Sequence, residues 1–279
     1  MVSNEQRRKQ LARQKYLRQQ ARRVQKRRRA RIRNTVIGAV LALALGLSAA
    51  AAAAGAFSGD KDSADNASDL PSAPPTSKAP DPCDKPAKGK PGEKQWKKEP
   101  EMSIDTSASY TMKLETTCGD ITVELDAEKA PHTVNSFHFL AGEKFFDHTK
   151  CHRLVTEGIH ILQCGDPTAT GRGGPGYTIP DENLKDPRLK DGVYPAGTVA
   201  MANSFNPQTG DGKDSGGSQF FLVYKDSELP AYYTPFGKVT EGMDVLKKIA
   251  KAGVSPDPAT GSTAPNATVV INKATVRKD

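Results

Sequence analysis

The chain has 279 residues and a formal net charge of +8; 36% of its residues are hydrophobic, 26% charged and 6% aromatic. The charge is uneven, because residues 1–33 hold 14 Lys and Arg side chains and one Glu, whereas the remaining residues hold 26 basic and 31 acidic side chains. This distribution excludes a uniformly basic nucleic-acid-binding domain, so we expect no nucleic-acid partner for the globular part. The four cysteines are too few and too scattered for a disulfide scaffold.

An uncharged run of 26 residues, 34–59, follows the basic arm of residues 1–33. As a helix the run would be about 39 Å long, which is enough for a bilayer core. We therefore predict a transmembrane helix or signal anchor over residues 34–57; the alternative is a signal peptide cleaved near Ala56. The positive-inside rule keeps the arm in the cytoplasm. The expected product is a single-pass protein of the cell membrane, or a secreted form, with its C-terminal part outside the cytoplasm.

Residues 58–103 contain eight prolines and few large apolar side chains. A segment of this composition cannot bury a core, so we predict a disordered linker. The only tryptophan, Trp96, lies in this segment, and we expect it to be incidental. Residues 104–279 are long enough to bury one core and are predicted to form the globular domain.

The globular part begins with two alternating segments, 110–115 and 121–125, which predict a hairpin. Pro131 then opens a predicted helix that Gly142 stops. A second helix has Met243, Leu246 and Ile249 on one face. Further strands are predicted at residues 151–155, 160–164, 198–202, 219–224, 236–239 and 267–276. Many short strands with two helices indicate a mainly β fold, a closed antiparallel barrel capped by the helices.

Common catalytic patterns such as G-x-S-x-G, H-E-x-x-H and the Walker loop are absent from the sequence. Cys151 and His152 are neighbours on a predicted strand and point to opposite faces, so we expect no metal site. A polar set inside apolar strands remains, and it consists of Arg153, Gln163, Asn203 and Gln219. With the neighbouring phenylalanines, this set could line a groove that hydrogen-bonds a peptide backbone and buries a small apolar ring.

Five motifs, in this order, resemble the cyclophilins, a family of peptidyl-prolyl cis–trans isomerases. The motifs are Cys-His-Arg (151–153), Gln-Cys-Gly-Asp (163–166), Met-Ala-Asn (201–203), Gly-Ser-Gln-Phe-Phe (217–221) and Pro-Phe-Gly-Lys-Val (235–239). The match covers roughly residues 108–277, and the arrangement looks like that of membrane-anchored bacterial cyclophilins. The resemblance implies a closed eight-stranded antiparallel barrel with a helix over each end and an active site on the outer barrel surface.

The resemblance also implies roles for single residues. Arg153 matches the catalytic arginine of the family. Substrate-contacting positions are matched by Gln163, Ile161, His160, Ala202, Asn203, Gln219, Phe221, Leu229 and Tyr233. The implied reaction is rotation about X-Pro bonds in exported or cell-surface proteins, which assists their folding and needs no metal or cofactor. The implied partners are proline-containing polypeptides, and we expect the chain to act as a monomer.

Two other functions stay open, one because of departures from the family pattern and one because of the charge of the basic arm. Cys151 replaces a usual phenylalanine, two extra residues separate Arg153 from Gln163, and His160 falls where a pocket phenylalanine is usual. The last change favours a module or chaperone that binds proline peptides without catalysis. The other alternative is a membrane scaffold that acts through its basic arm.

The cysteines of the globular part are Cys118, Cys151 and Cys164. We expect them to be free buried thiols, with a disulfide pair as the alternative. Three thiols in one domain leave at least one unpaired unless Cys83 joins them from the linker.

Overall fold

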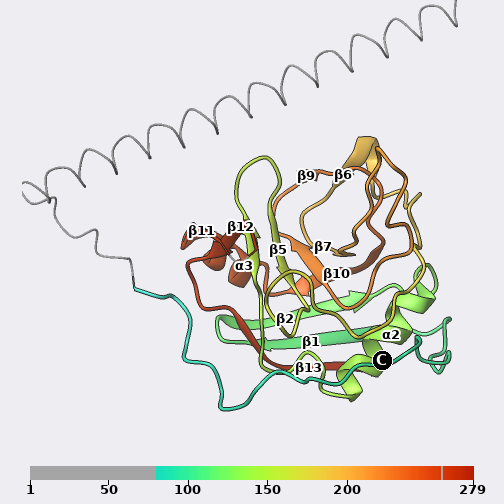
Figure 1. Ribbon diagram of the computed structural model, residues 1–279, viewed down its shortest axis with the longest axis horizontal. Helices are drawn as coiled ribbons and strands as arrows, with labels where there is room; N and C mark the ends of the chain where they lie inside the picture. Colours follow the sequence, from blue (N-terminus) through green and yellow to red (C-terminus); the bar gives the residue numbers. More distant parts are fainter. Residues whose placement is uncertain (1–79, 259) are drawn as a thin grey trace, which may run out of the picture. The chain divides into compact units, whose positions relative to one another are not determined.

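The computed structural model describes residues 80–258 and 260–279 (Figure 1). The basic arm, the predicted membrane segment 34–57 and the first part of the predicted linker lie outside the described residues. Among the residues that are described, no helix is both long enough and apolar enough to cross a membrane.

A curled antiparallel sheet of nine strands forms the main body of the domain (Figure 1). Its order is β3-β13-β1-β2-β10-β7-β8-β5-β4. The strands are β1 (Tyr110–Thr116), β2 (Gly119–Leu125), β3 (Thr149–Lys150), β4 (Arg153–Val155), β5 (Ile161–Cys164), β7 (Thr198–Met201), β8 (Phe220–Val223), β10 (Pro235–Glu241) and β13 (Val270–Lys278). The predicted hairpin is confirmed, because β1 and β2 pair along their whole length.

Shorter elements connect these strands. A two-stranded sheet pairs β6 (Val193–Tyr194), which follows the 3₁₀ turn η1 (Lys190–Gly192), with β9 (Ser227–Glu228), and another pairs β11 (Val254–Asp257) with β12 (Ser262–Pro265). The outermost strands of the large sheet, β3 and β4, are separated in the chain only by Cys151 and His152. One stretch, residues 149–155, therefore supplies both edges of the curled sheet.

Of the predicted closed eight-stranded barrel, the structure shows the coarser part, a curled antiparallel sheet. The pairing gives nine strands, with β3 and β4 outermost. The predicted strand 151–155 begins only at Arg153, as β4, and the short strand β3 precedes it. Cys151 lies between these two strands, where its N–H donates to the carbonyl oxygen of Val269 (2.9 Å). The mainly β class and the two helices of the prediction are retained.

Two helices pack against the sheet. The first, α2 (Pro131–Gly142), begins and ends at the predicted residues, since Pro131 supplies a φ angle already suited to a first helical position. Its Phe137 is fully buried and contacts Phe220 and Phe236 at ring distances of 5.5 and 4.6 Å. The second helix, α3 (Met243–Lys251), buries Val245, Leu246 and Ile249.

Strands β4, β5, β7 and β8 carry apolar side chains on both faces, and successive side chains alternate between the two faces. The inward residues join the main core; they are Leu154, Leu162, Cys164, Val199, Met201, Phe220 and Leu222. The outward residues of β5, β7 and β8, together with Tyr194 of β6, form a separate buried cluster, which we call the outer cluster; its members are Ile161, Tyr194, Ala200, Phe221 and Val223. The sheet thus separates a core from a second apolar surface.

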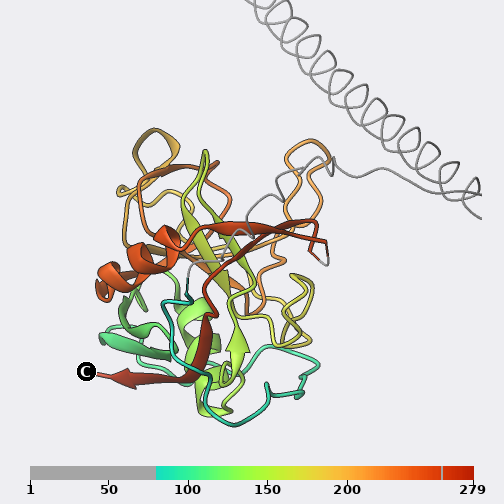
Figure 2. The ribbon, with the colours of Figure 1, turned by 90° about the vertical axis from the view of Figure 1, so that its left-hand side faces the viewer.

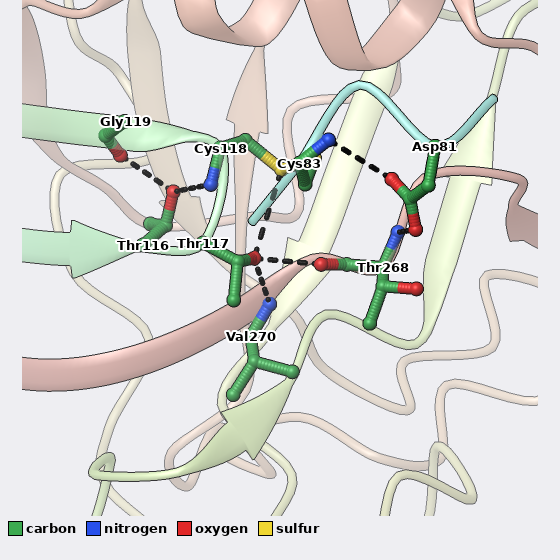
Figure 3. The surroundings of a disulfide bond; sticks show 8 residues. All are labelled: Asp81, Cys83, Thr116, Thr117, Cys118, Gly119, Thr268 and Val270. Atoms are coloured by element: carbon green, nitrogen blue, oxygen red, sulfur yellow. Dashed lines mark hydrogen bonds between the residues drawn. A yellow bond between two sulfur atoms is a disulfide. The ribbon is translucent and has the colours of Figure 1, made fainter. Parts of the chain in front are cut away.

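Residues 80–103, which we call the strap, contain no helix or strand but lie against the domain. Both ribbon views show the blue-green strap running along one side of the domain (Figure 1, Figure 2). Near its start, a disulfide joins Cys83 to Cys118 in the β1–β2 turn. Asp81 accepts hydrogen bonds from the N–H groups of Cys83 (3.0 Å) and Thr268 (2.9 Å) (Figure 3). These contacts fix the strap to two distant parts of the domain.

The far end of the strap is fixed as well. The Asn135 side chain of α2 donates to the carbonyl oxygens of Pro100 (3.2 Å) and Glu101 (3.1 Å). The Trp96 ring lies 5.1 Å from that of Phe139 and 6.0 Å from that of Phe145. The prediction of a disordered linker is therefore wrong for residues 80–103, and Trp96 is not incidental.

The cysteines also differ from the expectation of free thiols. Two disulfides are present, Cys83–Cys118 and Cys151–Cys164, so each of the four is paired. Cys83 joins from the strap, which makes the number of available thiols even. The second disulfide links the segment between β3 and β4 to the end of β5, on the inner face of the sheet.

Candidate active site

Arg153 and Gln163 face each other on the outer surface of the sheet. They are directly opposite in the pairing of β4 with β5. The Arg153 guanidinium is half-buried and donates through Nη1 to Gln163 Oε1 and through Nε to Ser262 Oγ, each at 3.0 Å. Burial lowers the pKa of Arg153 from its ordinary value, and Tyr233 opposes this shift. An arginine side chain nevertheless keeps its charge in a protein, so a fixed cation stands at this position.

A chain of side-chain amides continues from the arginine. Gln163 Nε2 donates to Gln219 Oε1 (2.9 Å), and Gln219 Nε2 donates to the carbonyl oxygen of Gly173 (2.9 Å). Each amide therefore accepts a hydrogen bond at its oxygen from the preceding member of the line and donates one from its nitrogen to the next. Because every member fixes the orientation of the next, the guanidinium is tied to the loop that holds Gly173.

That loop is organised by a buried carboxylate, Asp166. Its oxygens accept from the N–H groups of Thr168 (2.7 Å), Thr170 (3.0 Å) and Gly173 (3.1 Å). Burial alone would raise the pKa of Asp166, but these hydrogen bonds outweigh burial and hold the pKa below its ordinary value. A Cβ atom at residue 173 would lie 2.0 Å from Asp166 Oδ1, so only glycine fits there.

The apolar part of the site is the outer cluster. Gln163 lies opposite Phe221 in the β5–β8 pairing, and Phe221 lies opposite Ala200 in the β7–β8 pairing. Arg153, Gln163, Phe221 and Ala200 therefore form one row across four strands, on the same face. The Tyr233 ring, 5.4 Å from that of Phe221, packs against this cluster, as do Leu229 and Ala202. A charged donor thus stands beside a cluster of apolar and aromatic side chains.

A groove of about 770 Å³ adjoins the row. Its lining includes residues 171–178 of a neighbouring loop and four sequence-predicted residues, Gln163, Ala202, Asn203 and Gln219. The Asn203 side chain is itself engaged, since Nδ2 donates to the Tyr232 carbonyl oxygen (2.6 Å) and to Asp181 Oδ1 (3.3 Å). Its amide therefore holds the surrounding loops.

The structure brings together every sequence-predicted site residue except His160. His160 directly precedes β5, which begins at Ile161. Ile161 belongs to the outer cluster, whereas the His160 ring contacts Tyr224, a residue of the main core, at 5.7 Å. The assignment of His160 to the pocket is therefore not supported by its position.

Three features of the site were missed from the sequence. Tyr194 is fully buried in the outer cluster, and its hydroxyl donates to the Tyr233 carbonyl oxygen (2.8 Å). Ser262 accepts from Arg153, and the Gly173 carbonyl accepts from Gln219. Tyr194 stands in a Pro- and Gly-rich stretch without periodicity, and a backbone carbonyl has no signature in a sequence.

Comparisons with known proteins identify the family of the chain. The family described as "Cyclophilin type peptidyl-prolyl cis-trans isomerase/CLD" matches residues 111–276. "Probable peptidyl-prolyl cis-trans isomerase B" of Mycobacterium leprae is 44% identical over 171 residues, 58% of this chain and 56% of that protein. "Peptidyl-prolyl cis-trans isomerase B" of Bacillus subtilis is 40% identical over 135 residues, 48% of this chain and 85% of that protein. The chain therefore spans little more than half the length of the mycobacterial relative.

A solved structure is also similar to this chain. The crystal structure of a cyclophilin type peptidyl-prolyl cis-trans isomerase from Cryptosporidium parvum is 26% identical, with a TM-score of 0.49. The alignment covers 61% of this chain and 99% of that one.

Two buried tyrosines of this region make the free energy of unfolding depend on pH in the alkaline range. Burial raises the pKa of Tyr194 to about 12, and it raises the pKa of Tyr177, which lines the groove, to about 12 as well. An unfolded tyrosine ionises near pH ~10. Between these values the folded chain keeps two protons that the unfolded chain has lost. We therefore expect the free energy of unfolding to be highest below pH ~10 and to fall as the pH rises towards 12.

Phenolate absorbance measured against pH on the folded protein checks this prediction. Two of the seven tyrosines should titrate near pH 12 in the wild type, and one in either Tyr194→Phe or Tyr177→Phe. Unchanged titration in both variants would contradict it.

Proposed function

Because the chain belongs to the family of cyclophilin-type peptidyl-prolyl cis-trans isomerases, we propose that it accelerates rotation about X-Pro bonds in polypeptides. The observation that carries the proposal is the row of Arg153, Gln163 and Phe221 on one face of the sheet. It sets an always-charged donor beside an apolar surface that suits a proline ring.

The reaction breaks no covalent bond. Amide resonance sets a barrier of about 18–20 kcal/mol, and the uncatalysed rotation takes tens to hundreds of seconds. Catalysis therefore requires stronger binding of the twisted amide than of either planar form. When the amide twists, conjugation is lost and the proline nitrogen regains a lone pair, which can accept a hydrogen bond.

Arg153 is the residue placed to donate that hydrogen bond. A guanidinium has five N–H donors, and within the described residues Ser262 and Gln163 engage two of them. The remaining donors are available to a substrate next to the outer cluster. Because Gln163 and Ser262 hold the guanidinium in place, it needs little reorganisation as the amide twists.

The other residues bind the two sides of the rotating bond. Phe221, Ile161 and Leu229 of the outer surface, with Tyr233, form the apolar contact for the proline ring. The groove lined by Ala202, Asn203 and Gln219 receives the flanking peptide. One side of the bond is thus held while the other turns.

Replacing Arg153 tests this mechanism. In a proline-isomerisation assay on the full chain, we expect Arg153→Ala to lower kcat/KM by about 10²- to 10³-fold, the loss typical of one positioned donor. Arg277→Ala is the matched control, because Arg277 is exposed on β13. Wild-type rates in Arg153→Ala would remove this residue from the mechanism, and a wild-type chain that accelerates no rotation would refute the proposed activity.

We further propose that the domain works outside the cytoplasm, anchored by residues 34–57 or released by cleavage near Ala56. Two disulfides support this location, because such bonds persist in oxidising compartments and are rare in the cytosol. The basic arm before an apolar run supports the same orientation. The clients would then be exported or cell-surface proteins whose folding waits on X-Pro rotation.

Thiol tagging combined with cell fractionation tests the location. Cells are quenched in acid, and unpaired thiols are alkylated with a mass tag under denaturing conditions. We expect no tag before reduction, four tags after it, and a chain in the membrane fraction or the medium. Four tags before reduction, on a chain in the cytoplasmic fraction, would overturn the proposal.

A further inference from the structure

The strap reaches the groove of the candidate active site. Gln95 of the strap is exposed and lines the same groove as Gln163, Asn203 and Gln219. The strap lies outside residues 111–276, which match the family. One wall of the groove is therefore supplied by a segment that precedes the matched domain.

The strap approaches the groove loop very closely at Gly176. The Trp96 N–H donates to the carbonyl oxygen of Pro175 (2.8 Å). Gly176 has φ +90°, and a Cβ atom there would lie 2.7 Å from the Trp96 carbonyl oxygen and 3.0 Å from the Cβ of Gln95. Glycine at this position allows both the left-handed backbone and the close approach. Gln95 is therefore held directly beside the loop that lines the groove.

Contacts on both sides of Gln95 fix its position. Lys94 forms an ion pair with Glu143 (2.6 Å), and the Trp96 ring packs on Phe139 and Phe145. The exposed ion pair contributes little to holding the strap in place. The partly buried aromatic contacts of Trp96 and the Cys83–Cys118 disulfide limit how far the strap can leave the domain. The amide of Gln95 thus has a defined place although its segment has no regular secondary structure.

We infer that Gln95 is a specificity-determining residue, which contacts the substrate polypeptide at a position outside the X-Pro pair. The inference rests on the proposed function. The groove extends from Gln163, a member of the row of Arg153, and its hydrogen-bond partner Gln219, past the loop 171–176 to the strap. A polypeptide that follows it beyond the outer cluster meets the Gln95 amide. That amide can donate to and accept from a peptide backbone or a polar side chain.

Peptides of two lengths test the inference on the full chain. A tetrapeptide centred on Ala-Pro occupies the site near Arg153, whereas a decapeptide with the same centre also reaches the strap. Dissociation constants are measured by calorimetry, and kcat and KM by the isomerisation assay. We expect Gln95→Ala to weaken decapeptide binding by roughly two- to tenfold, the effect of one net hydrogen bond, and to raise KM with little change in kcat. Tetrapeptide binding should not change.

Two further variants separate contact from general structure. Lys97→Ala changes an exposed strap residue that does not line the groove, and it should leave both peptides unaffected. Gln95→Glu should bind decapeptides that carry Lys at the contacting position more tightly, and those that carry Glu there less tightly. A purely structural role for Gln95 would not distinguish between the two charges.

The inference is overturned if Gln95→Ala binds both peptides as the wild type does, or if it loses affinity equally for both. The same holds if Gln95→Glu shows no charge preference at any decapeptide position. Absence of isomerisation with normal peptide binding would refute the proposed function alone, because the binding constants still decide the role of Gln95.

Discussion

The structure depends on one constraint, which is that strands β5, β7 and β8 must bury side chains on both faces. Alternation sends Leu162 and Phe220 into the main core, and it sends Ile161 and Phe221 to the opposite surface. Inward packing holds the sheet, while outward packing creates an apolar surface outside it. A one-residue slip in β5 would exchange the two sets and remove core and site together.

The polar half of the site follows from the same register. Arg153 is opposite Gln163, and Gln163 is opposite Phe221, so the charged donor and the apolar surface have a fixed separation set by strand spacing. The amide chain through Gln219 extends this order to the loop around Asp166. The strap also contacts the groove loop, because Trp96 donates a hydrogen bond to the Pro175 carbonyl oxygen and Gln95 lies close to Gly176. The groove is therefore built from the sheet, a loop and the strap together.

Much of this arrangement could be predicted from the sequence, because local patterns determine it. Alternation of apolar and polar residues predicted the β1–β2 hairpin, and Pro131 and Gly142 predicted the bounds of α2. The ordered motifs suggested the candidate site residues. The motifs did not reveal that the His160 ring lies against Tyr224, a residue of the main core, rather than in the outer cluster. The strap was missed because its Pro- and Lys-rich composition resembles that of a disordered segment. Free thiols were preferred to the alternative of a disulfide pair because the Cys83–Cys118 bond is a tertiary contact, which local patterns do not reveal.

The central claim is that Arg153 donates a hydrogen bond to the nitrogen of the twisted amide, while Gln163 holds the guanidinium in position. A double-mutant cycle in kcat tests this claim most directly. The four proteins are wild type, Arg153→Ala, Gln163→Ala and the double variant. If Gln163 acts through the guanidinium, the double variant should turn over no more slowly than Arg153→Ala alone, because the amide then has nothing left to position. Losses in kcat that multiply in the double variant would contradict the account.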